Sequence, residues 1–129
     1  MSAQLNVVDS CGWLEYFANG PNADFFAPAI EAEKKLIVPH VVVFEVIRRL
    51  AHQRGEPAAR QAMGFLEKGR LVGLDAEGPC SAAMAAQQHR LAMADAMIWQ
   101  TAIGCGAQVY TQDADFKNLP QVVYRARPV

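Results

Sequence analysis

The sequence lacks a strong charge of either sign and has no long hydrophobic run. Its 129 residues include 12 basic and 13 acidic side chains, which give a formal net charge of −1. A balance this close to neutral provides no general electrostatic attraction to nucleic acid or to an anionic membrane, so any such binding must rest on a local patch. No apolar stretch approaches the roughly 20 residues that a membrane span requires.

Cysteine is scarce, and the first residues carry no secretion signal. The cysteines are odd in number and have no CxxC spacing, which is typical of reduced side chains. The first apolar run is only LNVV before Asp9 interrupts it, which is too short for a signal peptide. These features predict a cytoplasmic protein with free Cys11, Cys80 and Cys105.

The sequence does contain an alternation of short apolar runs with helical patterns. The strand candidates are Leu5–Val8, Leu36–Pro39, Arg70–Leu74, Val122–Tyr124 and the segment AQVYT. Apolar runs too short for helices suit strands that are buried on both faces. The alternation predicts an α/β fold with a parallel sheet of about four to five strands and helices on both faces, in one domain over residues 1–129.

Helical periodicity predicts the elements between these strands. The strongest pattern begins at His40, where valines form a wide apolar face, and Gly55 and Pro57 end it. Further helices are expected over Cys11–Phe17, over Ala58–Lys68 and over Pro79–His89, and Phe65 is expected as a core contact of the second of these. One more helix is expected after a cap at Asp24. The last begins at Asp95 and ends at Gly104 and Gly106.

The stretch from Leu91 to Phe116 places acids at both ends of a helix-then-strand unit. Asp95 stands at the start of the helix, and Asp113 and Asp115 follow the strand. In an open parallel sheet, strand carboxyl ends and helix amino ends share one edge, where ligands bind. Asp95 and Asp113 can therefore converge although they are distant in sequence.

Two more acids are aimed at the same edge or stand where a carboxylate is unexpected. Asp9 ends the first strand, and Glu45 lies beside the valine face of its helix. Each acid alone has an ordinary explanation, since Asp9, Asp95 and Asp113 are all acceptable helix-cap or turn residues. Glu45 is harder to explain, because it must reach solvent or find a cation.

A cluster of all four acids requires a counter-charge. Two carboxylates 5 Å apart repel by roughly 3 kcal/mol at an effective dielectric near 20. No basic residue adjoins Asp9, Asp95 or Asp113 in sequence, so a divalent cation is the natural counter-charge, and oxygen ligands favour Mg²⁺ or Mn²⁺. Zinc is disfavoured because the three histidines lack ligand spacing. Carboxylate-bound metals commonly serve phosphodiester hydrolysis.

The segments VVDSCGWLEYF, VVVFEVIRRL, ADAMIWQTA and VYTQDADF resemble the PIN domain, and their order and spacing are similar to those of VapC-type toxins. The resemblance spans nearly the whole chain. It implies a PIN-like fold and a Mg²⁺-dependent endoribonuclease that a VapB-type antitoxin neutralises. It also implies a homodimer that reaches operator DNA only through the antitoxin. The alternative is a PIN-domain RNA-processing nuclease outside any toxin-antitoxin pair.

Carried over position by position, the resemblance makes Asp9 and Asp95 direct metal ligands. Glu45 becomes a further ligand or the group that orients the attacking water, and Asp113 holds a second metal or its water. The fourth acid could instead be Asp115, although Asp113 is favoured.

The residues beside these acids only partly follow the family pattern. Members often have two hydroxyl residues after the first aspartate, but here only Ser10 matches and position 11 is Cys11. Thr111 resembles a family threonine that hydrogen-bonds the site, although an ordinary strand threonine fits equally well.

Two surfaces have both a structural and a functional interpretation. The basic face of the Glu45 helix is either a solvated surface or a phosphate track for RNA, with Arg48 and Arg49 as its clamps. The aromatic residues of the first two helices form either core or an apolar groove for the antitoxin. The basic face also includes His52 and Arg54, and the aromatic set is Trp13, Tyr16, Phe17, Phe25 and Phe26.

Other functional classes fit less well. A receiver-like phosphorylation switch needs paired acids after the first strand and a lysine after a late strand, but Asp9 is unpaired and Lys117 falls in a turn. An acyl-phosphate hydrolase needs D-x-D after the first strand, where position 11 is cysteine. A catalytically inactive binding module does not explain why all the acids are present.

Overall fold

Five parallel strands form the centre of the protein. The structure is a computed structural model and describes residues 4–129. The strands lie in the order β3-β2-β1-β4-β5, and every neighbouring pair is parallel. They are β1 (Leu5–Val8), β2 (Leu36–Pro39), β3 (Arg70–Val72), β4 (Ala107–Thr111) and β5 (Val122–Tyr124). The predicted number and direction of the strands are confirmed, and β3 ends two residues earlier than expected.

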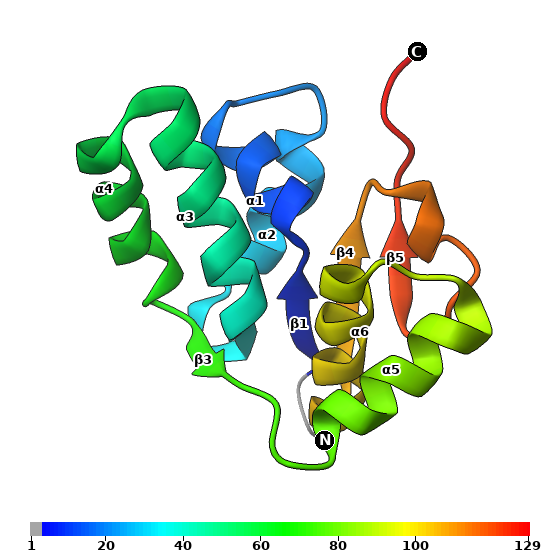
Figure 1. Cartoon of the computed structure of the whole chain (residues 1–129). Helices are drawn as coiled ribbons and strands as arrows, with labels where there is room; N and C mark the ends of the chain where they lie inside the picture. The colour runs from blue at the N-terminus through cyan, green and yellow to red at the C-terminus, as the bar shows by residue number, and fades with distance from the viewer. Residues whose placement is uncertain (1–3) are drawn as a thin grey trace.

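Helices cover both faces of this sheet. In Figure 1, α6 and α5 lie in front of the strands, and α2 lies behind β1 and β2. The helices are α1 (Ser10–Phe17), α2 (Ala23–Glu31), α3 (His40–Arg54), α4 (Glu56–Leu66), α5 (Gly78–His89) and α6 (Met93–Cys105), with short 3-10 turns η1 (Glu33–Lys35) and η2 (Ala114–Phe116). The result is the expected three-layer α/β/α arrangement.

The first strand lies at the point where the strand order reverses. The chain builds β2 and β3 on one side of β1 and then crosses to β4 and β5 on the other side. Val7 and Val8 are fully buried, which explains why β1 is apolar without alternation. Because the carboxyl end of β1 adjoins this switch point, Asp9 emerges where an open α/β sheet forms its ligand crevice.

Several predicted helix ends are wrong by one or two residues. Asn22, not Asp24, is the N-cap residue of α2, and Asp24 lies in the first turn. Helix α6 starts at Met93, so Asp95 is in its first turn. Gly104 lies inside this helix and only Gly106, with φ +66°, caps it. Local sequence patterns indicate that a helix is present more reliably than they indicate its first residue.

The hydrophobic core lies between the sheet and its two helical layers. Its largest fully buried side chains include Trp13 and Phe26. Phe65, expected in the core, is instead 47% exposed, and its ring lies edge-on to that of Phe17, with the centroids 5.7 Å apart. Within residues 4–129, no helix combines the length and the apolarity that crossing a bilayer requires.

Candidate active site

Asp9 is held in a fixed orientation at the carboxyl end of β1. It is the N-cap residue of α1, and its Oδ1 accepts a hydrogen bond from the backbone N–H of Gly12 at 2.8 Å. The thiol of Cys11 donates to the same carboxylate, with Sγ 3.1 Å from Oδ2. Gly12 allows α1 to pack this closely, because a Cβ there would lie 2.6 Å from Val8 Cγ1. Asp9 is therefore both a helix cap and a buried carboxyl group.

The hydroxyl of Thr111 joins Asp9 to the segment that carries Asp113. Thr111 Oγ1 donates to Asp9 Oδ2 at 2.5 Å and accepts from the backbone N–H of Asp113 at 2.9 Å. Thr111 ends β4 next to β1, where Val8 pairs with Tyr110. The accessory contact predicted for Thr111 is present, and it fixes Asp113 relative to Asp9.

Helix α3 brings Glu45 to the same edge. The hydroxyl of Ser10 donates to Glu45 Oε1 at 2.5 Å, which orients a half-buried carboxylate. Glu45 thus turns away from the valine core and towards the first turn of α1. Ser10 contacts the acidic group as predicted, although it bonds Glu45 and not Asp9.

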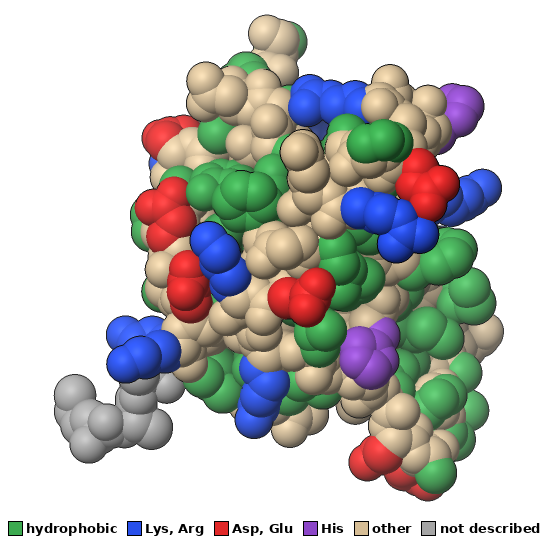
Figure 2. Space-filling view, turned by 90° about the vertical axis from the view of Figure 1, so that its left-hand side faces the viewer, with side chains coloured by type: hydrophobic (Ala, Val, Ile, Leu, Met, Phe, Trp, Pro, Cys, Tyr) green, Lys and Arg blue, Asp and Glu red, His purple; other side chains and the backbone are tan. Residues whose placement is uncertain are grey.

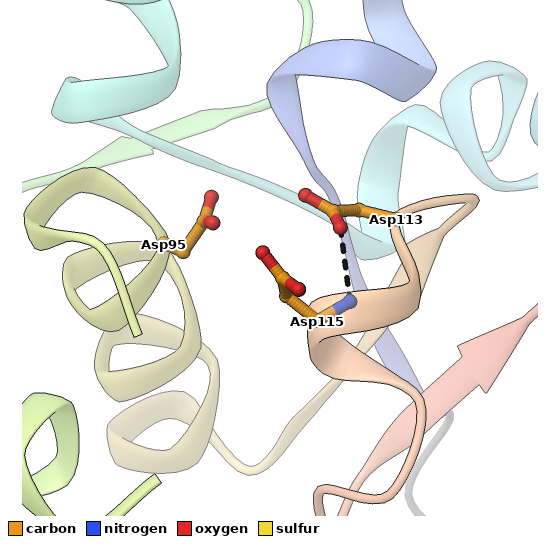
Figure 3. Close-up of side chains that lie close together, drawn as sticks. All are labelled: Asp95, Asp113 and Asp115. Carbon is orange, nitrogen blue, oxygen red and sulfur yellow. Dashed lines mark hydrogen bonds between the residues drawn. The ribbon is translucent and has the colours of Figure 1, made fainter. Parts of the chain in front are cut away.

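Three aspartates approach one another between α6 and η2. Asp95, Asp113 and Asp115 can each offer a carboxylate oxygen so that all three atoms lie within 4.8 Å of one another. Figure 3 shows Asp95 pointing from α6 towards the other two. Asp113 also caps η2, because its Oδ1 accepts from the backbone N–H of Asp115 at 2.9 Å. Asp113 is half-buried, whereas Asp115 is exposed.

A single cavity collects the four acids that the sequence singled out. Its volume is about 490 Å³, and its lining includes Asp9, Glu45, Asp95 and Asp113. Asp115 is not part of this lining. The other lining residues are Ser10, Cys11, Leu14, Arg48, Arg49 and His52. The basic residues of α3 thus border the acidic cavity, while Arg54 does not reach it.

Burial and neighbouring carboxylates raise the pKa of Asp9 and of Asp95. Burial raises the pKa of Asp9, and the charge of Asp113 raises it further, while the hydrogen bonds of Asp9 oppose the shift. Burial and then the charges of Asp113, Asp9, Glu45 and Asp115 raise the pKa of Asp95 to about 7. Ion pairs among residues 4–129 join only Arg60 to Glu56 and Arg125 to Asp24, so no basic side chain of this part of the chain pairs with the cluster.

An oxygen-rich, mutually repelling cluster fits a hard divalent cation. Carboxylate oxygens are the ligands that Mg²⁺ and Mn²⁺ prefer, and a bound cation would reverse the repulsion that raises the pKa of Asp95. The donors that surround Asp9 also keep its carboxylate orientation fixed, which metal ligands commonly require. The carboxylate oxygens that the structure brings within 4.8 Å of one another are those of Asp95, Asp113 and Asp115, and Asp9 and Glu45 line the same cavity as Asp95 and Asp113.

The thiol of Cys11 belongs to this site as a hydrogen-bond donor. Burial, then the charge of Asp9 and the hydrogen bond to it, raise the pKa of Cys11 to about 12. The thiol therefore stays protonated at neutral pH and can donate to Asp9, as a hydroxyl in the same place would. All three cysteines are free, as predicted, and Cys80 is exposed.

The aromatic residues of α1 and α2 do not form one exposed groove. Trp13 and Phe26 are fully buried, and their three aromatic neighbours in these helices are partly buried against the core. The exposed aromatic rings are instead Phe44, at 63%, and Phe65. Figure 2 shows the face that carries α3 and α4, with hydrophobic surface between scattered charged side chains. Helical periodicity did not reveal these exposed rings.

Comparison with known proteins places this fold in a family. Residues 7–122 match the PIN domain, and the chain belongs to the PIN domain family. Comparison with curated proteins gives no match. Each of the solved structures described below is less than 25% identical to this chain. These similarities therefore support the fold alone.

Three of these structures come from bacterial toxin-antitoxin systems. A toxin-antitoxin complex from Klebsiella pneumoniae has a TM-score of 0.74 at 21% identity, covering 92% of this chain and 95% of that one. VapC20 of Mycobacterium tuberculosis, described as a Sarcin-Ricin loop cleaving toxin, has a TM-score of 0.75 at 18% identity, covering 91% of this chain and 96% of that one. VapBC2 of Rickettsia felis, bound to a promoter DNA fragment, has a TM-score of 0.73 at 15% identity, covering 95% of this chain and 98% of that one.

Proposed function

We propose that this protein is a VapC-type toxin, a Mg²⁺-dependent endoribonuclease that forms one domain over residues 1–129. The observation that carries the proposal is the convergence of Asp9, Glu45, Asp95 and Asp113 on one cavity bordered by arginines. Membership of the PIN domain family supports a nuclease. The resemblance to VapC toxins in fold and in motif order supports the toxin assignment.

The resemblance to the PIN domain and the shared cavity support a catalytic role for each of the four acids. Asp9 and Asp95 would be the direct ligands of Mg²⁺, for which Mn²⁺ could substitute. When bound, the cation would supply activation of a water molecule and stabilisation of the leaving oxygen. Glu45, oriented by Ser10, completes the coordination or accepts a hydrogen bond from the attacking water. Asp113 would hold a second cation or its water.

The basic residues bind the substrate. Arg48 and Arg49 are exposed on α3 and line the same cavity as Glu45, so a phosphate beside the acids lies within their reach. A guanidinium group offers paired donors that match phosphate oxygens. The RNA backbone would therefore approach the metal along this helix, and phosphate contacts would position it without reading its sequence.

The proposed partner is a VapB-type antitoxin. The similarity in fold to VapBC2 of Rickettsia felis, which is bound to a fragment of its promoter DNA, supports an antitoxin that connects toxin and operator. The protein would be a cytoplasmic homodimer that contacts operator DNA only through that antitoxin. A short adjacent reading frame encoding a DNA-binding protein would separate this role from RNA processing by a solitary PIN-domain nuclease.

Purified protein and total RNA test the enzymatic proposal. We expect discrete cuts in the presence of Mg²⁺, and we expect both EDTA and Asp9→Asn to abolish them. Glu67→Gln is the matched control, because it removes an exposed carboxylate outside the cavity. Mapping of the cut ends identifies the site of cleavage. Cleavage that persists in EDTA or in the Asp9→Asn variant would disprove the proposal.

A further inference from the structure

The side chain of Asn22 does not cap the helix that it precedes. Asn22 is the N-cap residue of α2, a position where an asparagine usually accepts a hydrogen bond from the first turn of its own helix, but no such bond is present. Its backbone N–H donates to Glu15 Oε2 at 2.7 Å, which fixes the residue against α1. Asn22 is only 4% exposed. A buried amide without a local partner must find its hydrogen bonds elsewhere in the fold.

The Asn22 amide binds two segments that are distant from it in sequence. Its Nδ2 donates to Gln112 Oε1 at 3.0 Å and to the carbonyl of Ala126 at 3.1 Å. The two N–H groups of the amide are thereby both used. Gln112 is itself only 7% exposed, and a buried acceptor that loses its donor is costly. These bonds therefore constrain the positions of Gln112 and of the chain at Ala126.

Gln112 connects two residues of the acidic site. Thr111, directly before it, donates to Asp9, and Asp113, directly after it, donates its backbone N–H to Thr111. Gln112 and Asp113 lie between β4 and η2, outside both elements. Side-chain hydrogen bonds, from Thr111 to Asp9 and from Asn22 to Gln112, therefore help to fix this short segment.

The second bond of Asn22 acts on the same strand end. The backbone N–H of Arg125, which precedes Ala126, donates to the carbonyl of Thr111 at 3.1 Å and continues the β4–β5 pairing beyond its last residue. Asn22 thus binds the residue after Thr111 and also the residue after Arg125. One buried side chain of the α1–α2 connection therefore constrains the end of β4 from which the chain proceeds to Asp113.

We propose that Asn22 is a positioning residue of the acidic site, which holds Asp113 in place by way of Gln112. The inference rests on the proposed metal-dependent function and assigns a role to a residue that does not line the cavity. Carboxylates bind a cation tightly only when the surrounding structure holds them in place. Without the Asn22 bonds, the segment that carries Asp113 would bind the cation more weakly. Arg48 and Arg49 would still bind RNA, because they belong to α3.

Two variants of similar size break the amide bond from either side. Asn22→Leu removes both donors, whereas Gln112→Met removes only the acceptor of the first bond and leaves the bond to Ala126 in place. Gln121→Met is the matched control, because Gln121 Nε2 donates to the carbonyl of Ala107 at 2.7 Å, at the opposite, amino end of β4. The double variant Asn22→Leu with Gln112→Met tests whether the two residues act as one unit.

Mg²⁺ alone is the first probe. The rise in Tm of each variant across a Mg²⁺ series reports its affinity for the cation without any RNA, and melting without Mg²⁺ shows how much stability each variant loses. Steady-state cleavage of a labelled single-stranded RNA oligonucleotide is then measured at a temperature where the variants are folded. This assay separates kcat, KM and the Mg²⁺ concentration that gives half the maximal rate.

We expect Asn22→Leu to bind Mg²⁺ about 10-fold more weakly and to lower kcat about 10-fold, as for other residues that orient metal ligands, with KM within about twofold of the wild type. Gln112→Met should show most of this loss, and the double variant should lose no more than Asn22→Leu. Gln121→Met should lose stability while its Mg²⁺ affinity and kcat stay unchanged. Gln112→Met keeps one of the two Asn22 bonds, so it provides the test if Asn22→Leu does not fold.

Mg²⁺ affinity and kcat equal to those of Gln121→Met would overturn the inference, as would losses that multiply in the double variant. If the wild type then binds Mg²⁺ and cleaves RNA, the proposed function stands and only the role of Asn22 is lost. A wild type whose Tm does not respond to Mg²⁺ and that does not cleave RNA would overturn both.

Discussion

The hydroxyl of Thr111 lies 2.5 Å from the carboxylate of Asp9, although 102 positions separate the two residues. The same hydroxyl accepts a hydrogen bond from the backbone of Asp113. A single side chain thus sets the distance between an acid of β1 and an acid that follows β4. This relationship makes Thr111 the residue on which the geometry of the site depends most directly outside the acids themselves.

Thr111→Val keeps the shape of this side chain and removes its hydroxyl. We expect cleavage to fall about 10- to 100-fold, as for other partners that orient metal ligands, and stability to fall by about 1–3 kcal/mol because a buried carboxylate loses a donor. Thr101→Val is the control, since Thr101 is also buried but bonds only the carbonyl of Met97 in its own helix. Equal activity of the two variants in a cleavage assay would contradict this role.

The raised pKa of Asp95 predicts how stability depends on pH. The folded protein holds this proton up to about pH 7, while the ordinary pKa is 3.8. The resulting stabilisation is complete below pH 3.8 and is lost as the pH rises towards 7. Without divalent cations, Asp95→Asn should therefore exceed the wild type in stability at pH 8. We expect on the order of 1 kcal/mol after allowance for solvent screening, or roughly 4 °C in Tm.

Thermal melting at pH 4 and pH 8 measures this difference. The gap between Asp95→Asn and the wild type should close at pH 4 and should also narrow when Mg²⁺ is added at pH 8, because the cation stabilises only the intact cluster. Glu67→Gln should show no comparable gap, since this exposed carboxylate lies outside the cavity. A gap independent of both pH and Mg²⁺ would argue against electrostatic repulsion as its cause.

The fold could be predicted from sequence because its signals are local. Strands buried on both faces appear as short apolar runs, and the valine face of α3 follows helical periodicity. The position of Asp9 at the sheet edge follows from its place directly after such a run. The acids could then be grouped because the carboxyl ends of parallel strands share one edge.

The parts that could not be predicted depend on contacts between distant residues. Nothing near Ala126 in sequence indicates that Asn22 binds its carbonyl across 104 positions. The exposure of Phe65 depends on how α4 is rotated about its own axis. Ser10 was expected to bond the acids, but only the packing of α1 on α3 shows that its partner is Glu45.

Substitution of Asp113 and of Asp115 can identify the fourth acid. Asp113→Asn keeps an acceptor for the N–H of Asp115 and removes only the charge, so we expect a loss of cleavage of roughly 100-fold with little change in stability. Asp115→Asn should lower cleavage by less than about 10-fold, because Asp115 is exposed and outside the cavity lining. Measurement of kcat/KM with Mg²⁺ compares the two variants directly. The opposite ranking would make Asp115 the fourth acid.

Charge reversal on α3 tests the proposed RNA track. The double variant Arg48→Glu and Arg49→Glu places two anions beside an acidic cavity, so we expect RNA affinity to fall at least 10-fold and its salt dependence to flatten, since phosphate contacts are lost. Filter binding across a salt series measures both quantities. Arg70→Glu controls for the change in net charge. Cleavage and salt slope equal to those of the wild type would show that this face is only solvated.

Cys11 should act as a hydrogen-bond donor and not as a reactive thiol. Its pKa of about 12 keeps it protonated at pH 8, and alkylation requires the thiolate. Iodoacetamide should therefore label exposed Cys80 many times faster than Cys11, as peptide mass spectrometry can measure. Because Cys11→Ser retains a donor for Asp9, its cleavage rate should stay within about threefold of the wild type. The cleavage rate of Cys11→Ala should fall about tenfold, since the orientation of the Asp9 carboxylate is less constrained. Rapid alkylation of Cys11, or equal activity of the serine and alanine variants, would show that the thiol does not orient Asp9.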